Sequence, residues 1–167
     1  RSRPMEDVLD EVKRLAAQGV KEVNVVAQDT TRYGDDLYGR LVLPELLREI
    51  CKIDGIRWVR ILYCYPDRIT DELLEVMAQE EKIVKYVDVP IQHASGEVLR
   101  AMNRKGNADT LKALLQKIRD KVPGVVLRTT MIVGFPGETE EQFEELCNFI
   151  HEVKFERLGC FTYSREE

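Results

Sequence analysis

Residues 125–153 read VVLRTTMIVGFPGETEEQFEELCNFIHEV, which is a strand, a glycine turn and a capped helix in direct succession. The apolar run 125–133 is typical of a buried strand. Gly134 and Gly137 break that run, and Thr139 with Gln142 has the spacing of a helix-capping box. The stretch is therefore one complete strand–helix unit, and the rest of the chain repeats it.

The same alternation of strand and helix extends outward to both ends of the sequence. Helical spacing of apolar residues predicts helices over 5–16, 41–53, 71–79, 95–102, 108–122 and 140–153. Apolar runs predict strands over 22–28, 57–65, 85–92, 125–133 and 157–164. Strands separated by helices indicate βαβ units and a five-stranded parallel sheet of the α/β class. Periodicity alone does not distinguish an open doubly wound sheet from a partial β/α barrel.

Length and composition indicate one ordinary domain. The 167 residues are 44% hydrophobic and 33% charged, with a net charge of −5. The negative charge argues against a dedicated nucleic-acid-binding surface, and no apolar run is long enough to span a bilayer. No signal peptide opens the chain, so we expect a cytoplasmic protein with no membrane partner. The sequence begins at Arg1 without an initiator Met, and we expect it to be a piece of a longer protein.

The cysteine and histidine positions predict no metal site within this chain. Cys51, Cys64, Cys147 and Cys160 form no CxxC or CxxxCxxC group. Each lies in an apolar helix or strand pattern, so we expect free, buried thiols. His93 and His151 are far apart, with no ligand spacing around them.

In either α/β architecture the ligand lies at the carboxyl ends of the strands. Polar residues follow four of the predicted strands there, and they should share one rim: Gln28, Asp29, Thr30 and Thr31; Tyr65, Asp67 and Arg68; Gln92, His93 and Ser95; and the loop 134–138. The opposite rim has only short turns. One face is therefore expected to contain the chemistry.

Several of these residues have a structural reading beside the functional one. The loop 134–137 lacks the spacing of a phosphate loop or of GxGxxG, and it is either a plain turn or a site where backbone approaches a flat ligand such as adenine. Arg128 lies inside an apolar strand, so it is either paired or faces a ligand carboxylate or phosphate. His93 is either a catalytic partner of Gln92 or a satisfied structural histidine. Four tyrosines are candidates for stacking or for packing: Tyr33, Tyr38, Tyr63 and Tyr65.

Four motifs in order resemble one known family. They are AQDTTRYGDDLYGR (27–40), YVDVPIQHASGEVLRAMNRKG (86–106), RTTMIVGFPGETEEQFEEL (128–146) and FTYSREE (161–167). Together they are similar to the radical S-adenosylmethionine (radical SAM) core of the methylthiotransferases. The segments QDTTRYG, QHAS and TTMIVG are more similar to the sequences of the RimO-like branch, which modifies a ribosomal protein, than to those of the branch that modifies tRNA.

The resemblance implies a fold and a cofactor. The fold should be a partial (β/α) TIM-like barrel of the radical SAM type, and the cofactor S-adenosylmethionine. Ile132 and Gly134 match the adenine-contacting motif, with Glu138 one position beyond the usual spacing of its acidic residue. Arg128, Gln92 and Thr30 are similar in location to residues that hold the cofactor's carboxylate, ribose and amino groups, and Gln28 lies on the same rim.

The resemblance also implies parts that these 167 residues do not contain. The family's CxxxCxxC loop, which holds a 4Fe–4S cluster, normally lies shortly before RSRP. We expect the chain to be a single core unit, 1–167, without that loop, without the N-terminal cluster-binding domain and without the C-terminal RNA-binding-type domain. Three thiolates must converge on one cluster, so the chain alone is expected to bind none and to be inactive.

The predicted activity of the parent protein is thiomethylation of an aspartate β-carbon in the twelfth small-subunit ribosomal protein. Asp29, Arg32 and His93 are the predicted substrate-binding residues, because cationic and donor groups favour a carboxylate-bearing side chain. No residue is assigned as catalytic, and no strong nucleic-acid binding is expected of this chain. Two alternatives stay open, a tRNA adenosine methylthiotransferase and a non-catalytic α/β binding module.

Overall fold

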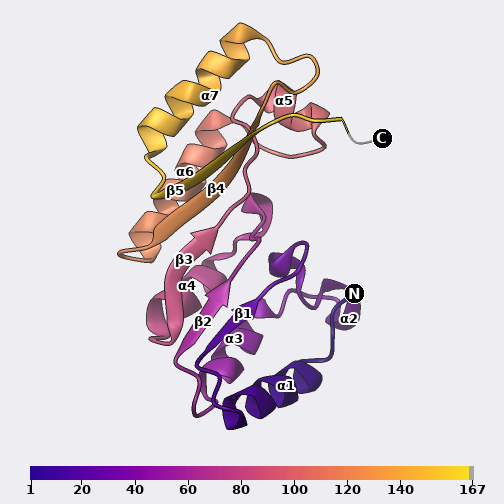
Figure 1. Ribbon diagram of the computed structural model, residues 1–167, viewed down its shortest axis with the longest axis vertical. Helices are drawn as coiled ribbons and strands as arrows, with labels where there is room; N and C mark the ends of the chain where they lie inside the picture. The colour runs from indigo at the N-terminus through magenta and orange to yellow at the C-terminus, as the bar shows by residue number, and fades with distance from the viewer. Residues whose placement is uncertain (166–167) are drawn as a thin grey trace.

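The computed structural model describes residues 1–165 and contains one five-stranded sheet (Figure 1). The strands lie in the order in which the chain makes them, and every neighbouring pair is parallel. Their bounds are β1 Glu22–Val25, β2 Trp58–Ile61, β3 Ile83–Asp88, β4 Val126–Val133 and β5 Arg157–Thr162. The five predicted parallel strands are confirmed.

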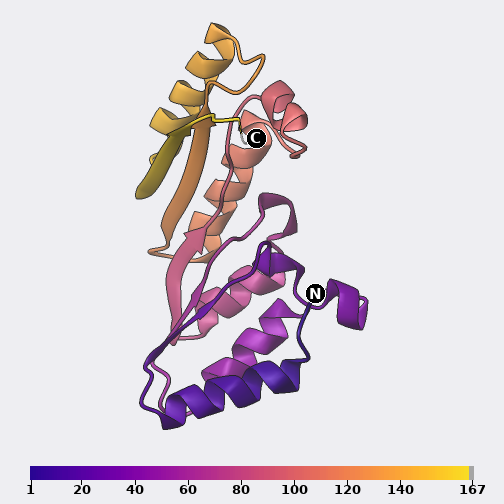
Figure 2. The ribbon, with the colours of Figure 1, turned by 45° about the vertical axis from the view of Figure 1, so that its right-hand side comes forward.

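The strand order distinguishes the two architectures that periodicity left open. A doubly wound sheet reverses its strand order at a switch point, and the order β1-β2-β3-β4-β5 contains no reversal. Successive helices contact one another in the order α1, α3, α4, α6 and α7, so they form one layer on one face of the sheet. Figure 2 shows α1, α3 and α4 together on one side of the first strands. This is the arrangement of a partial β/α barrel, as the resemblance implied.

The helices begin at the capping residues that the sequence indicates. Thr139 and Gln142 form the predicted capping box, and the Thr70 hydroxyl accepts the Leu73 N–H at the start of α4. The bounds are α1 Met5–Ala17, α2 Asp35–Tyr38, α3 Leu43–Cys51, α4 Asp71–Gln79, α5 Gly96–Ala101, α6 Ala108–Lys121 and α7 Glu140–Val153. Two short 3-10 helices, η1 Thr30–Arg32 and η2 Pro66–Arg68, lie in the loops after β1 and β2.

The first three strands are shorter at their carboxyl ends than the apolar runs predict. β1 ends at Val25 rather than 28, β2 at Ile61 rather than 65, and β3 at Asp88 rather than 92. Pro90 has no N–H to extend the ladder after β3, and Tyr63 has a positive φ of 57° that turns the chain after β2. The residues beyond these ends are therefore rim loops. The predicted loop after β1 also differs, because it contains η1 and α2.

The two faces of the sheet differ in burial. The helix-covered face has a closely packed core, in which Leu47, Val59, Leu74, Ile118 and Leu127 are each 0% exposed. Burying one such side chain contributes about 1.5–3 kcal/mol to the free energy of unfolding. The other, open face has polar or exposed side chains at alternate positions of the strands: Asn24, Trp58, Arg60, Tyr86, Arg128 and Phe161. The open face is therefore available to a ligand.

The cysteines only partly match the expectation of buried thiols. Cys51 and Cys64 are buried, but Cys147 is half-buried and Cys160 is exposed. Cys160 lies on β5, which pairs with β4 on one side only among the described residues. The prediction was wrong for Cys160, since an apolar strand pattern does not show that the strand lies at an edge.

Candidate functional site

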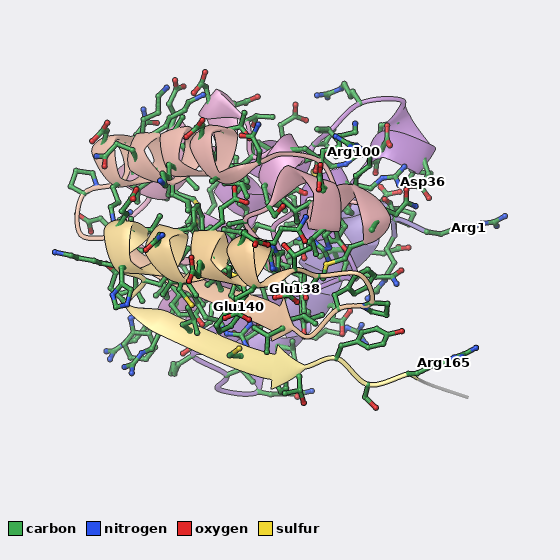
Figure 3. The ribbon with its side chains drawn as sticks, turned by 90° about the horizontal axis from the view of Figure 1, so that it is seen from above. Arg1, Asp36, Arg100, Glu138, Glu140 and Arg165 are labelled. Atoms are coloured by element: carbon green, nitrogen blue, oxygen red, sulfur yellow. The ribbon has the colours of Figure 1, made fainter. Side chains whose placement is uncertain are left out.

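The loops that follow the strands gather at one rim of the sheet. Viewed from above, the β5 arrow points toward the side of the molecule where Arg1, Asp36 and Arg165 lie (Figure 3). The first residues of the chain join the same rim, because the Ser2 N–H donates to the Asp36 carboxylate and the Tyr33 hydroxyl donates to the Arg3 carbonyl oxygen. The rim is thus built from parts that are distant in the sequence.

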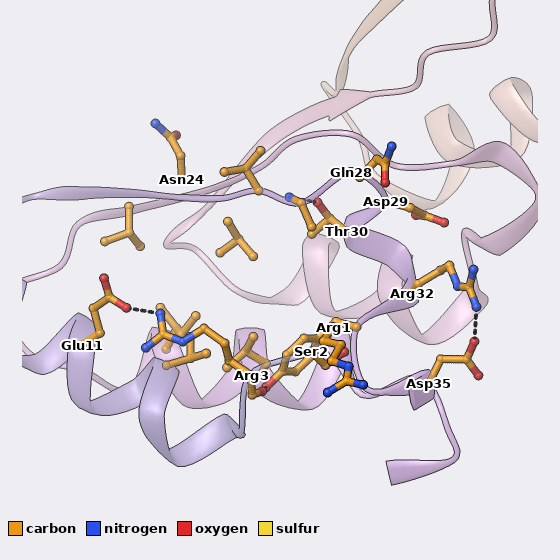
Figure 4. A pocket seen from close by; sticks show the side chains of 18 of the residues that line it. Arg1, Ser2, Arg3, Glu11, Asn24, Gln28, Asp29, Thr30, Arg32 and Asp35 are labelled. Carbon is orange, nitrogen blue, oxygen red and sulfur yellow. Dashed lines mark hydrogen bonds and ion pairs between the residues drawn. The ribbon is translucent and has the colours of Figure 1, made fainter. Parts of the chain in front are cut away.

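A cavity of about 980 Å³ lies at the β1 end of this rim (Figure 4). Its polar end brings together four of the predicted residues, Gln28, Asp29, Thr30 and Arg32. Its other wall is made by apolar residues of α1 and β1, among them Val12. The remaining predicted residues lie outside it: Gln92, His93, Arg128, Ile132 and Gly134.

Internal contacts occupy three of the four residues in this cavity. The Thr30 hydroxyl donates to the Leu62 carbonyl oxygen at 2.5 Å and accepts the Ala27 N–H at 3.0 Å, and Thr30 is 2% exposed. The Asp29 carboxylate accepts the Thr31 N–H at 3.1 Å. Arg32 pairs with Asp35 at 2.9 Å, although its side chain is still 55% exposed. Gln28 is exposed. Thr30 and Asp29 therefore hold the loop in shape, whereas Gln28 and Arg32 have atoms free for a ligand.

Arg128, which the sequence left as either paired or facing a ligand, forms an ion pair on the open face. Asp88 and Arg128 are register partners on β3 and β4, and Arg128 Nη1 lies 2.7 Å from Asp88 Oδ1. The hydrogen bond to Asp88 is the main reason why the pKa of Arg128 is raised. The Asp88 side chain is 3% exposed and that of Arg128 is 34% exposed. Arg128 is therefore paired, yet part of its guanidinium faces the open side of the sheet.

Asp88 is a site residue that the sequence reasoning missed. Besides Arg128, its second carboxylate oxygen accepts the Tyr63 N–H at 3.3 Å. A charged residue inside the apolar run 85–92 was the available signal, of the same kind that drew attention to Arg128.

A second charged group lies on the open face, nearer the amino ends of the strands. Arg60 Nε donates to Glu22 Oε1 at 2.8 Å, and its guanidinium carbon lies 5.1 Å from the centre of the Tyr86 ring. This stacked arrangement holds Arg60 without a ligand. The two guanidinium groups are similarly exposed, at 30% for Arg60 and 34% for Arg128, but Arg128 lies nearer the carboxyl ends of the strands, where a ligand is expected.

The glycine turn after β4 leaves its backbone uncovered. Gly134 and Gly137 have φ values of 72° and 87°, a region that favours glycine. No atom lies within 4 Å of where a Cβ on Gly134 would sit, so the space beside this backbone is open. Gln92 holds the strand before it, since its carbonyl oxygen accepts the Ile132 N–H at 2.8 Å. The open backbone beside Ile132 fits the approach of a flat ring.

Glu138 and His93 hold this turn from behind. Glu138 Oε2 accepts the Phe135 N–H at 2.9 Å, and Glu138 Oε1 lies 3.5 Å from His93 Nε2. The His93 ring is 0% exposed, and its Nδ1 accepts the Ser95 N–H at 3.0 Å. His93 is enclosed in this structure, so its contact with a substrate stays a prediction. Glu138 lies one position beyond the usual place of the acidic residue in the adenine-contacting motif, and here it links the turn to the buried histidine.

The described residues do not fit an iron–sulfur cluster. No group of three or more His, Cys, Asp or Glu side chains within residues 1–165 is arranged to hold a metal ion. Burial raises the pKa of the Cys64 thiol to about 12 and that of Cys51 to about 11, which disfavours the thiolate form that ligates iron.

Across residues 1–165, no helix is both long and apolar enough to cross a bilayer.

The sequence profile of the Radical SAM superfamily matches residues 1–150. The chain belongs to the radical SAM superfamily. Membership implies S-adenosylmethionine and an iron–sulfur cluster as the family's cofactors. For S-adenosylmethionine, the open backbone at Gly134 fits the adenine end, and the part-exposed Arg128 fits the carboxylate end.

Several curated relatives of this radical SAM chain carry the same name. Ribosomal protein uS12 methylthiotransferase RimO from Alkaliphilus oremlandii is 55% identical over 166 residues, which are 99% of this chain and 38% of that protein. The protein of the same name from Pelotomaculum thermopropionicum is 56% identical over 167 residues, or 100% of this chain and 38% of its own length. The chain thus spans about 38% of the length of the curated relatives it matches.

Solved structures with low identity share the fold. Coproporphyrinogen III oxidase (HemN) from Escherichia coli, a radical SAM enzyme, superposes with a TM-score of 0.67 at 21% identity, over 97% of this chain and 38% of that one. SuiB from Streptococcus suis, bound to S-adenosylmethionine, gives a TM-score of 0.64 at 19% identity, over 99% of this chain and 35% of that one. These matches support the partial barrel of the radical SAM type.

Proposed function

We propose that this chain is the central part of a methylthiotransferase that modifies an aspartate of ribosomal protein uS12 in the cytoplasm. The observation that supports the proposal best is the 55–56% identity, over essentially the whole chain, to proteins named for that activity. The reaction replaces a hydrogen on the aspartate β-carbon by a methylthio group. In a longer parent, a cluster-binding loop, an N-terminal cluster domain and a C-terminal RNA-binding-type domain would complete the enzyme.

In this proposal the chain's own residues bind and orient the S-adenosylmethionine, which supplies a reactive adenosyl group when bound. Ile132 and Gly134 contact the adenine at the open turn, and Gln92 lies beside them for the ribose. Arg128 has guanidinium donors left over from Asp88 for the cofactor's carboxylate. Gln28 lies exposed on the neighbouring rim loop for the amino end, and Thr30, whose hydroxyl is occupied within the loop, holds that loop in place. The protein's part is to orient the cofactor and exclude water.

The substrate aspartate enters from the same rim. Arg32 is the best placed of the three proposed substrate residues, because its guanidinium is 55% exposed beside the cavity. Asp29 shapes the loop that presents it, and His93 lies under the neighbouring turn. A cation at the entrance lowers the free-energy cost of bringing a carboxylate into a dry site.

The test uses the full-length parent enzyme with its clusters reconstituted. It is incubated with reductant, a sulfur source and S-adenosylmethionine, together with either uS12 or unmodified tRNA. Mass spectrometry should find one methylthio group in place of hydrogen on an aspartate of the protein, and none on the tRNA. An Arg32→Ala variant should lose turnover mainly through a higher KM, whereas Lys13→Ala, on the far side of α1, should not. Modification of tRNA alone would refute the proposal.

A further inference from the structure

Tyr63 combines an unfavourable backbone with an exposed aromatic ring. Its φ is 57°, in the left-handed region that bulky residues seldom adopt, yet 45% of the residue is exposed. A glycine there would avoid the steric cost, and an exposed ring gives little packing energy in return. Strained non-glycine residues of this kind cluster at sites that contact ligands.

The contacts around Tyr63 show what holds it. Its N–H donates to Asp88 Oδ2 at 3.3 Å, and its carbonyl oxygen accepts the Thr30 N–H at 3.0 Å. Asp88 Oδ1 at the same time pairs with Arg128 at 2.7 Å. One buried carboxylate therefore fixes both the strained backbone of Tyr63 and the guanidinium of Arg128.

Tyr63 and that guanidinium are held by the two oxygens of one carboxylate. The Tyr63 N–H lies 3.3 Å from Asp88 Oδ2 and Arg128 Nη1 lies 2.7 Å from Asp88 Oδ1, so the exposed Tyr63 side chain leaves the backbone close to the cation. The part-exposed Arg128 is thus within reach of an exposed aromatic side chain at the carboxyl end of β2. A carboxylate bound by Arg128 would have this ring as its wall.

We propose that Tyr63 is a cofactor-contacting residue whose ring covers the amino-acid end of S-adenosylmethionine held at Arg128, and that Asp88 is the positioning residue for both. This inference rests on the proposed cofactor site and extends it. The strain at Tyr63 is then part of the binding site, because the turned backbone directs the ring toward the ligand.

The test compares two ligands that differ only at the amino-acid end. S-adenosylhomocysteine has it, and 5′-methylthioadenosine lacks it. Titrations of the whole 167-residue chain are followed by NMR chemical shifts, which detect weak binding. Tyr63→Gly should weaken S-adenosylhomocysteine binding by about fivefold or more and leave methylthioadenosine binding within about twofold. Tyr63→Phe should retain most of the affinity, and Asp88→Asn should behave as Tyr63→Gly does.

Urea unfolding of the same variants separates binding from structure. Tyr63→Gly relieves the positive φ and should not lower the urea midpoint. The matched control is Lys154→Gly, since Lys154 has a φ of 55°, is exposed, and lies at the far end of α7. It should raise the midpoint and leave both affinities unchanged.

Four outcomes would overturn the proposal. A lower urea midpoint for Tyr63→Gly with unchanged affinities would make Tyr63 merely structural. Equal losses for both ligands would place the ring elsewhere on the cofactor. If the wild-type chain binds methylthioadenosine but gains nothing from the amino-acid end, this inference fails while the adenosyl site stands. If it binds neither ligand, the proposed cofactor site fails as well.

Discussion

Removing the Glu138 carboxylate should destabilise the chain far more than removing its neighbour on α7. Glu138 is 5% exposed in its side chain, accepts the Phe135 N–H at 2.9 Å and faces His93 Nε2 at 3.5 Å. The buried His93 Nε2 makes no hydrogen bond among the described residues. Glu138→Ala therefore leaves one donor, the part-buried Phe135 N–H, without its acceptor.

The size of the loss follows from the Phe135 hydrogen bond. A hydrogen bond to a charged group contributes about 1.5–3 kcal/mol, and the His93 contact is too long to add much. We expect Glu138→Ala to lower the free energy of unfolding by about 2 kcal/mol, which is a melting temperature lower by about 4–8 °C for a chain of this size. Glu138→Gln retains an acceptor and should lose less than about 1 kcal/mol.

The measurement is urea unfolding. The slope of the free energy of unfolding against urea concentration should be the same in all variants, because it scales with the surface that unfolding exposes. The matched control is Glu140→Ala, an exposed carboxylate in the first turn of α7, which should cost only about 0.3–1 kcal/mol through the helix dipole. Amide exchange at Phe135 should rise in Glu138→Ala alone. If the two alanine variants unfold at the same urea concentration, the account of Glu138 is wrong.

Other consequences of the structure can be tested on the same chain. Cys160 should react fast with a thiol reagent, whereas Cys51 and Cys64 should react only after unfolding, because both are buried and burial raises the pKa of Cys64 to about 12; equal rates for all thiols in the native chain would contradict the burial. Anaerobic reconstitution of the isolated chain should give no stoichiometric iron and sulfide, and a near-complete 4Fe–4S content would refute the reasoning from thiol positions. Burial opposes ionisation of Glu156, but the Leu127 N–H and Arg119 lower its pKa overall from the usual 4.5, so its contribution to stability is complete above that value and is lost as the pH falls through the lower, folded value. Glu156→Gln should therefore flatten the acid branch of a stability–pH curve measured by urea unfolding, and an unchanged branch would show that Glu156 does not contribute to it.

Local sequence patterns were sufficient for the order of the main strands and helices and for the family. The run 125–133 is a strand and 140–153 a helix because hydrophobic periodicity and the Thr139–Gln142 capping box act within a few residues of each other. The same locality makes the motifs recognisable, and the rule that ligands bind at the carboxyl ends of parallel strands indicated the rim in advance.

Tertiary structure decided how those elements meet. The sequential strand order, which distinguishes the partial barrel from a doubly wound sheet, depends on pairing between segments far apart in the chain. Asp88 and Arg128 are 40 residues apart, so neither residue's neighbours show that they pair, and the positive φ of Tyr63 is stabilised by the same Asp88 carboxylate. Likewise, local periodicity could not show that β5 lies at an edge and leaves Cys160 exposed. Propensity and capping are short-range effects, whereas ion pairs, edges and strained backbones are set by contacts that exist only once the sheet has formed.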